Sequence, residues 1–207
     1  IETGAEVVIG NSDVGNDVSF HLAGDFLNRS TDPTIFDWRY GPLVLNGTDQ
    51  MFEVAGEDRG PTEEGFDNNF AMNWLNVRAG TAVNFRDTFG NRSLEPGQCS
   101  EALYVQHLIL DDASTVTIDD CRVYYTHLIG DAESATVLGC GALVQIPTGD
   151  FDGDGVVDLS DYGAFATCVE DSKPDALAPG CGAFDLHVDG ALDVTDFGAF
   201  QLVFDGA

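Results

Sequence analysis

Basic residues are scarce in this sequence of 207 residues. It has 8 Lys and Arg against 36 Asp and Glu, which gives a formal net charge of -28 at pH 7. A surface of this charge repels phosphate backbones and anionic lipids, so it argues against nucleic-acid and membrane-surface partners. The sequence also lacks any run of the roughly 20 apolar residues that would span a bilayer. The charge favours metal cations or a basic partner, and it also promotes solubility.

Motifs of the common catalytic sites are absent as well. The sequence contains no nucleophile elbow, zinc-protease helix, phosphate-binding loop or dinucleotide fingerprint. Pairs of carboxylates at glycosidase-like separations must occur by chance among 36 acidic residues, so they carry no information. We therefore expect a protein that is not an enzyme.

Cysteines are few, and the 5 that are present form no Cys-x-x-Cys pair. With only 4 histidines, this argues against a structural zinc site. A disulfide between Cys168 and Cys181 would close the Pro-containing segment KPDALAPG, and we expect it. Of Cys99, Cys121 and Cys140, one must stay unpaired or bond to another chain, and we favour a Cys121–Cys140 pair.

Two stretches nevertheless concentrate carboxylates at matching intervals, GDFDGDGVVDLSDYGAF at 149–165 and FDLHVDGALDVTDFGAF at 184–200. The first places acidic side chains at loop positions 1, 3, 5, 9 and 12, with glycine at position 6 and a backbone carbonyl available at position 7. This is the oxygen-ligand spacing of a calcium loop. The predicted ligands of a first Ca²⁺ ion are Asp150, Asp152, Asp154, Val156, Asp158 and Asp161.

The second stretch repeats this frame with one departure. His187 stands at position 3, where an oxygen ligand is expected, and imidazole is a poor partner for calcium. The sequence therefore predicts a second, weaker Ca²⁺ site, or one in which a water completes the shell. Its predicted ligands are Asp185, His187, Asp189, Ala191, Asp193 and Asp196.

The segment 149–204 resembles the dockerin family, a tandem of calcium loops that are each followed by a helix. The resemblance implies two Ca²⁺ ions and two antiparallel helices that begin near Leu159 and Val194, as in a small EF-hand-like pair. Dockerins that bind cohesins carry polar pairs at loop positions 10 and 11 and basic residues further along the helix. Here the pairs are Leu159-Ser160 and Val194-Thr195, and no Lys or Arg follows in either helix. This departure from the family pattern argues against ordinary cohesin binding, so the family's partner does not carry over to this chain.

The first 147 residues show short apolar or alternating runs separated by Gly, Asn and Asp turns, which is typical of β-strands. A strand–turn–strand unit recurs at 43–54, 75–85 and 108–118, with a looser copy at 7–20. A fixed period of this kind favours a β-solenoid, or β-helix, and a β-sandwich is the alternative. The region is also similar in style to solenoid-like modules of secreted bacterial proteins. We expect a β-rich repeat domain at 1–147 and a calcium-binding domain at 148–207.

Two functions compete at this point. The first is a secreted calcium-binding structural protein that assembles with itself, or with another extracellular protein, into a fibre, tube or surface layer. The alternative is a small carbohydrate-binding or carbohydrate-active protein, for which Trp38 and Trp74 are candidate stacking residues. The chain begins at Ile1 and its predicted sites suit extracellular calcium, so we expect an extracellular or cell-surface protein whose signal peptide has been removed.

Overall fold

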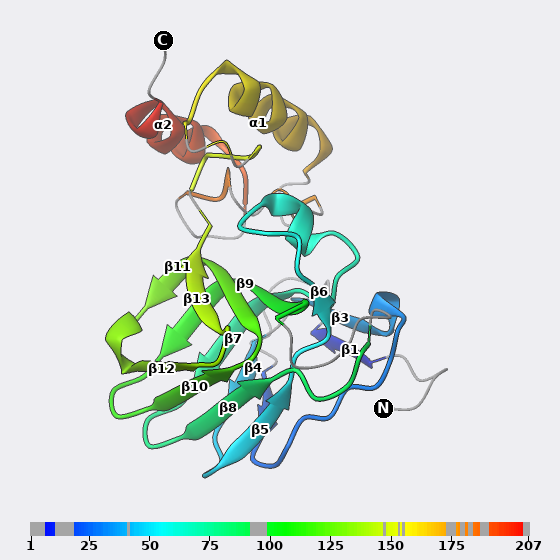
Figure 1. The fold of residues 1–207 in the computed structure, drawn as a ribbon. Helices are drawn as coiled ribbons and strands as arrows, with labels where there is room; N and C mark the ends of the chain where they lie inside the picture. The colour runs from blue at the N-terminus through cyan, green and yellow to red at the C-terminus, as the bar shows by residue number, and fades with distance from the viewer. Residues whose placement is uncertain are drawn as a thin grey trace.

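The structure is a computed structural model and describes residues 7–10, 19–40, 42–91, 99–146, 148–152, 154, 156–172, 177–178, 181, 184–186 and 191–204. These residues form two β-sheets and two α-helices (Figure 1). The β-strands occupy the chain up to residue 145, and both helices follow them. Among the described residues, neither helix has the length and apolar character needed to cross a membrane.

Within the described part of the chain, the larger sheet has nine strands and the smaller has four. The larger contains β1 (Val7–Gly10), β2 (Phe20–Leu22), β3 (Phe36–Tyr40), β4 (Leu43–Leu45), β6 (Gly56–Glu57), β7 (Met72–Val77), β9 (Glu101–Leu110), β11 (Arg122–Ile129) and β13 (Ala142–Gln145). The smaller contains β5 (Gln50–Glu53), β8 (Ala82–Arg86), β10 (Thr115–Asp119) and β12 (Ala135–Leu138). Three short 3₁₀ turns lie at η1 (Pro33–Ile35), η2 (Glu63–Phe66) and η3 (Ala132–Ser134).

From β7 onward, successive strands alternate between the two sheets. Within the smaller sheet the order is β12-β10-β8-β5, and all of these neighbours are parallel. Equivalent residues of neighbouring strands lie side by side, as Phe85, Ile118 and Val137 do on β8, β10 and β12. Parallel pairing in register therefore stacks like side chains into rows, which is how one apolar position per strand builds a continuous core.

The main core lies between the two sheets. Its buried members include Phe52 and Phe85 from the smaller sheet and Leu75, Leu108 and Val123 from the larger. In β8 and β10 the buried side chains alternate with partly exposed ones, because successive side chains of a strand point to opposite faces. Burial of this apolar surface is the main driving force for folding of the β-strand region.

The fold class predicted from the sequence is wrong. A sandwich is excluded because the strands of both sheets pair in parallel, with β6 and β9 as the antiparallel exception among the described pairs. A uniform solenoid is not the fold either, because the larger sheet branches: β7 pairs with β3, β4 and β9. With its two parallel-strand sheets and two helices the chain is a mixed α/β structure, rather than a β-solenoid beside an EF-hand pair.

The sequence repeat corresponds to recurring pairs of strands, but it does not determine which strands become neighbours. Local spacing locates strands and turns, whereas the choice of neighbouring strand depends on backbone hydrogen bonds between distant segments. The short strand β6 illustrates this, because Gly56 and Glu57 pair with Ala102 and Glu101 across more than forty positions. No periodic pattern in the sequence marks that contact.

One predicted disulfide is confirmed and the other is wrong. Cys168 bonds to Cys181, with their Cα atoms 5.6 Å apart. Cys140 bonds to Cys99 rather than to Cys121. Cys121 is a free, buried cysteine because its side chain packs into the core between the sheets. Cys140 is exposed, and its partner in the structure is Cys99.

Candidate metal centres

The first predicted calcium loop brings its carboxylates together. One carboxylate oxygen each of Asp150, Asp152 and Asp154 lies within 4.8 Å of the others. Asp150 is buried, whereas Asp152 and Asp154 are exposed. The backbone N–H of Asp154 donates hydrogen bonds to Asp150 Oδ1 (3.1 Å) and Asp152 Oδ1 (3.2 Å), so the chain curls around its own side chains. This arrangement of oxygens is the kind that binds one hard cation.

The end of this loop is also the beginning of helix α1 (Leu159–Asp171). Asp158 is the N-cap residue and accepts a hydrogen bond from the backbone N–H of Ser160. Asp161 closes a capping box, because its Oδ2 accepts from the N–H of Asp158 at 2.8 Å. The predicted helix start at Leu159 is confirmed.

Asp161 has a second task in the loop. Its Oδ1 accepts hydrogen bonds from the backbone N–H groups of Phe151 (2.6 Å) and Asp152 (3.3 Å). The Asp161 side chain is only 1% exposed. Its hydrogen bonds connect the first residues of the loop to the first turn of the helix in the interior of the module. The predicted ligand Val156, in contrast, is held by its own N–H, which donates to Asp154 Oδ1 at 2.9 Å.

Electrostatics of the loop favour a bound cation. The pKa of Asp152 is raised above its ordinary value, first by partial desolvation and then by the charges of Asp154, Asp161 and Asp150. A raised carboxylate pKa means that the ionised form is disfavoured among its neighbours. A divalent cation would remove this repulsion by supplying the missing positive charge.

The second loop repeats the helix-start geometry. Asp193 caps helix α2 (Val194–Val203) by accepting from the N–H of Thr195, and Asp196 Oδ2 accepts from the N–H of Asp193 at 2.9 Å. The helix starts at Val194, as predicted. Of the other predicted ligands, Asp185 is buried and Ala191 is half-buried, while His187 and Asp189 lie outside the described residues.

A small aromatic core joins the two loops and their helices. Phe165 of α1 stacks on Phe200 of α2 with ring centroids 5.2 Å apart. Phe184, which immediately precedes the second loop, is fully buried and packs edge-on against Phe165. The Cys168–Cys181 disulfide belongs to the same cluster. Each loop therefore leads into a helix that is packed against its counterpart.

A row of rings connects the larger sheet to the second loop. Trp74 of β7, His107 of β9 and His127 of β11 occupy equivalent positions on neighbouring strands. Ring centroids of Trp74 and His107 are 3.9 Å apart, and those of His107 and His127 are 5.1 Å apart. His127 also forms a hydrogen bond with the backbone of Asp185. The sheet therefore contacts the first ligand position of the second loop.

This row bears on the predicted sugar-stacking residues. One face of the Trp74 indole is covered by His107, so that face is not open to a sugar ring. The backbone of Trp38 pairs with Met72 on β7, but its side chain lies outside the described residues. The sugar-stacking role of Trp38 and Trp74 therefore stays a prediction.

His107 predicts a pH dependence of stability. Burial, followed by the neighbouring His127, lowers the pKa of His107 from 6.5 to about 3. Between these values the unfolded chain binds a proton that the folded chain does not bind. The free energy of unfolding should therefore fall as the pH falls through about 6.5, by up to about 1.4 kcal/mol per pH unit from this residue.

The measurement is urea unfolding at several pH values of the parent chain and of a His107→Phe variant, which keeps a flat ring in the row. The variant should show a shallower fall of stability between pH ~7 and pH ~5. A His21→Phe variant is the matched control, because His21 is exposed on β2 and lies outside the row. Equal pH slopes for the parent and His107→Phe would contradict the prediction.

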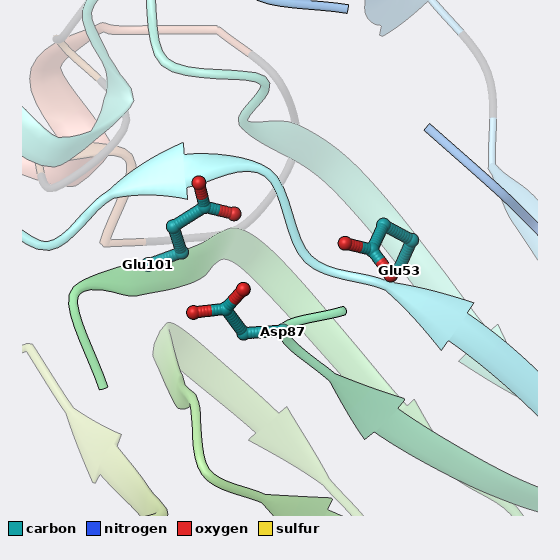
Figure 2. Close-up of side chains that lie close together, drawn as sticks. All are labelled: Glu53, Asp87 and Glu101. Atoms are coloured by element: carbon teal, nitrogen blue, oxygen red, sulfur yellow. The ribbon is translucent and has the colours of Figure 1, made fainter. Parts of the chain in front are cut away.

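A second acidic cluster was not predicted from the sequence. Glu53 ends β5, Asp87 follows β8 directly, and Glu101 begins β9. One carboxylate oxygen of each lies within 4.8 Å of the others, and the residues are 1%, 4% and 0% exposed (Figure 2). The pairing of Glu53 with Arg86 brings Asp87 beside Glu53. Glu101 comes from the other sheet, and the three residues are far apart in the sequence, so no local motif could have revealed the cluster.

Burial makes this cluster electrostatically demanding. The pKa of Glu53 is raised, chiefly by burial, and the charge of Asp87 raises it further. Burial also raises the pKa of the free Cys121 thiol, with Asp87 and Glu53 adding to the effect. Burying several carboxylates close together is costly unless a proton or a cation compensates their charge.

Comparison of the chain with models of protein families, with curated proteins and with solved structures found no match. The functional argument therefore depends on the geometry of the two metal centres.

Proposed function

We propose that this chain is a secreted, non-catalytic structural protein whose C-terminal region is a dockerin-type module that folds around two Ca²⁺ ions. In this proposal the module docks onto another copy of the chain, and calcium controls assembly. The proposed location is extracellular or at the cell surface. The two disulfides are compatible with it, because such bonds persist in oxidising compartments.

The observation that carries the proposal is the convergence of Asp150, Asp152 and Asp154 at the head of a capped helix. The same helix start recurs at Asp193 and Asp196, which supports a second copy of the site. Carboxylates at this spacing supply the oxygen ligands that calcium takes in loops of this length. An ion that binds the folded loop and not the unfolded chain would stabilise the module by mass action.

Exposed apolar side chains on the helices support a docking role. Leu159, Val194 and Leu202 are 72%, 84% and 88% exposed, so each helix carries exposed apolar side chains in a very acidic chain. Exposed apolar groups of this kind mark interaction surfaces when they gather on one module. A second exposed pair, Val137 and Leu138, lies on β12 at the end of the smaller sheet. These two surfaces are the proposed contacts between copies.

The test is the particle size of the full chain in Ca²⁺ and in EDTA, followed by light scattering and electron microscopy. We expect large assemblies in Ca²⁺ that dissociate in EDTA and re-form when Ca²⁺ is restored. Calcium should act by ordering the loops and by reducing the repulsion between chains of net charge -28.

Two variants sharpen this test. Asp154→Ala/Asp189→Ala removes one acidic ligand from each loop and should leave a chain that stays small in Ca²⁺. Asp112→Ala removes an exposed carboxylate between β9 and β10 and should assemble like the parent. A parent chain of constant size in both solutions, or a loop variant that assembles normally, would refute the proposed function.

A further inference from the structure

We propose that Glu53, Asp87 and Glu101 form a third cation site, which binds Ca²⁺ inside the β-strand region. This site is separate from the two C-terminal loops, and it does not depend on their function. It would hold together three strand ends from the two sheets.

The geometry fits one ion. Calcium binds its oxygen ligands at 2.3–2.6 Å, so two oxygens on opposite sides of the ion lie up to about 5 Å apart. The three carboxylates each offer an oxygen within 4.8 Å of the other two. Figure 2 shows them grouped around a common space, each carried by a different strand end. A single ion could therefore contact all three without a change of backbone.

The hydrogen bonding of Glu53 points to a missing ligand. Its Oε1 accepts from the backbone N–H groups of Thr88 (3.0 Å) and Phe89 (2.7 Å). Its Oε2 is buried and accepts no hydrogen bond from the described residues. The residue is only 1% exposed, and its carboxylate points toward Asp87 and Glu101 (Figure 2). A buried carboxylate oxygen without a partner is costly, and a cation in the common space would satisfy it.

Asn91 adds a second buried oxygen of the right kind. Its backbone N–H donates to Glu101 Oε1 at 2.6 Å, and its side-chain amide donates to the carbonyl oxygens of Asn28 and Ser30. Its Oδ1 is buried and has no hydrogen-bond partner among the described residues. Amide oxygens are common calcium ligands, and this one belongs to a residue that is bonded to a member of the cluster.

Several arginines of the β-strand region are engaged elsewhere. Their guanidinium groups pair with other carboxylates, in the pairs Arg59–Glu57, Arg78–Asp111, Arg86–Asp119 and Arg122–Asp58. Arg29 lies over the ring of Phe89, 4.3 Å from its centroid. A small cation from solution is therefore a natural source of positive charge for the cluster.

The ligand chemistry selects a hard cation. All three members of the group are carboxylates, and the sulfur of Cys121 is not among the ligand atoms within 4.8 Å. Oxygen-only sites favour Ca²⁺ or Mg²⁺, whereas zinc prefers nitrogen and sulfur. Three strand ends that leave room for oxygens up to 4.8 Å apart suit calcium better than the smaller octahedral shell of Mg²⁺.

The first experiment counts calcium ions in the full-length Asp154→Ala/Asp189→Ala chain by equilibrium dialysis with ⁴⁵Ca²⁺. Because both C-terminal loops are weakened in this chain, we expect one bound ion to remain. Adding Glu53→Gln should remove that ion or weaken its binding by about a hundredfold or more. Adding Glu64→Gln, the same change at an exposed residue of η2, should leave it in place. Absence of a bound ion in the loop-weakened chain would overturn the proposal.

A second measurement separates ion binding from a merely structural effect of Glu53. Thermal unfolding of the parent and of Glu53→Gln is compared in Ca²⁺ and in EDTA. If the cluster binds calcium, Ca²⁺ raises the Tm of the β-strand transition in the parent and not in the variant. In EDTA the variant should be at least as stable as the parent, because it carries one buried charge fewer. An equal Tm rise in both chains would also overturn the proposal.

The outcome for this site is distinguishable from the outcome for the proposed function. Failure of the C-terminal loops to bind calcium would leave one ion in the parent chain, and Glu53→Gln would remove it. Failure of the third site would leave only ions that the Asp154→Ala/Asp189→Ala change displaces.

Discussion

Replacing Asp161 by Ala should abolish calcium binding by the first loop and destabilise the start of α1. The side chain accepts three backbone hydrogen bonds, from Phe151, Asp152 and Asp158, and it is almost fully buried. Its loss leaves these donors without a charged acceptor and removes an acidic ligand at position 12. Hydrogen bonds to charged groups contribute about 1.5–3 kcal/mol each and are not additive. We expect a loss of about 3–5 kcal/mol in the presence of Ca²⁺.

The measurement combines two experiments. Calorimetric titration with Ca²⁺ counts the bound ions, and circular dichroism monitors the helix signal during thermal unfolding. The parent should bind one more ion than Asp161→Ala, and the variant should unfold its helices at a lower temperature. Asp171→Ala is the matched control, because it makes the same change at the exposed last residue of α1. An acidic residue is unfavourable at a helix C-terminus, so this control should be neutral or slightly stabilising. Equal ion counts and equal melting temperatures for Asp161→Ala and the parent would contradict the prediction.

Asp161→Asn divides the two roles of this residue. The amide keeps one oxygen acceptor and nearly the same shape, so part of the hydrogen bonding to the loop can survive. It lacks the negative charge that binds calcium, and one of its two positions becomes a donor. We therefore expect Asp161→Asn to lose affinity for calcium while it retains more helix stability than Asp161→Ala.

The structure explains why the C-terminal features could be predicted from the sequence. In each loop the interacting residues lie within twelve positions of one another in the sequence. Their spacing is therefore enough to predict which side chains can meet. Asp158 and Asp161 cap α1 by contacts over three positions, and Asp193 and Asp196 do the same for α2. The disulfide between Cys168 and Cys181 also spans only 13 positions. Local geometry was sufficient in all of these cases.

The features that were missed depend on long-range pairing. Glu53, Asp87 and Glu101 meet because the ends of β5 and β8 in the smaller sheet lie beside the start of β9 in the larger sheet. The Cys99–Cys140 disulfide joins positions 41 apart, and both backbones are held by Asp120. The cysteine count allowed this pair, but nothing in the sequence ranked it above Cys121–Cys140. The fold class failed for the same reason, since the choice of strand neighbours is not a local property.

Two asparagines that stand in possible N-glycosylation sequences are buried in the folded chain. Asn28 and Asn91 stand in Asn-x-Ser sequences, yet they are only 1% and 2% exposed. The Asn28 side chain accepts from the N–H of Ser30, and the Asn91 amide donates to the backbone carbonyls of residues 28 and 30. These asparagines therefore brace two loops against each other inside the folded chain, where a glycan has no space.

Removing the Cys168–Cys181 disulfide should make the C-terminal module depend on calcium for its folding. A cross-link over a loop of this size restricts the unfolded chain and contributes about 3 kcal/mol. Calcium acts on the other side of the equilibrium, because it binds the folded loops. The two effects should therefore add. We expect the Cys168→Ala/Cys181→Ala chain to lose about 3 kcal/mol in Ca²⁺ and to lose its helices in EDTA.

The measurement follows the helix signal in circular dichroism during urea unfolding, in Ca²⁺ and in EDTA. Cys99→Ala/Cys140→Ala is the matched control, because it removes the other disulfide, which lies in the β-strand region. That control should lower the stability of the sheets and leave the response of the helices to calcium unchanged. A Cys168→Ala/Cys181→Ala chain that keeps its helices in EDTA would show that aromatic packing around Phe165, Phe184 and Phe200 suffices to hold the module. Calcium would then have no structural role there, and calcium-controlled assembly would lose its physical basis.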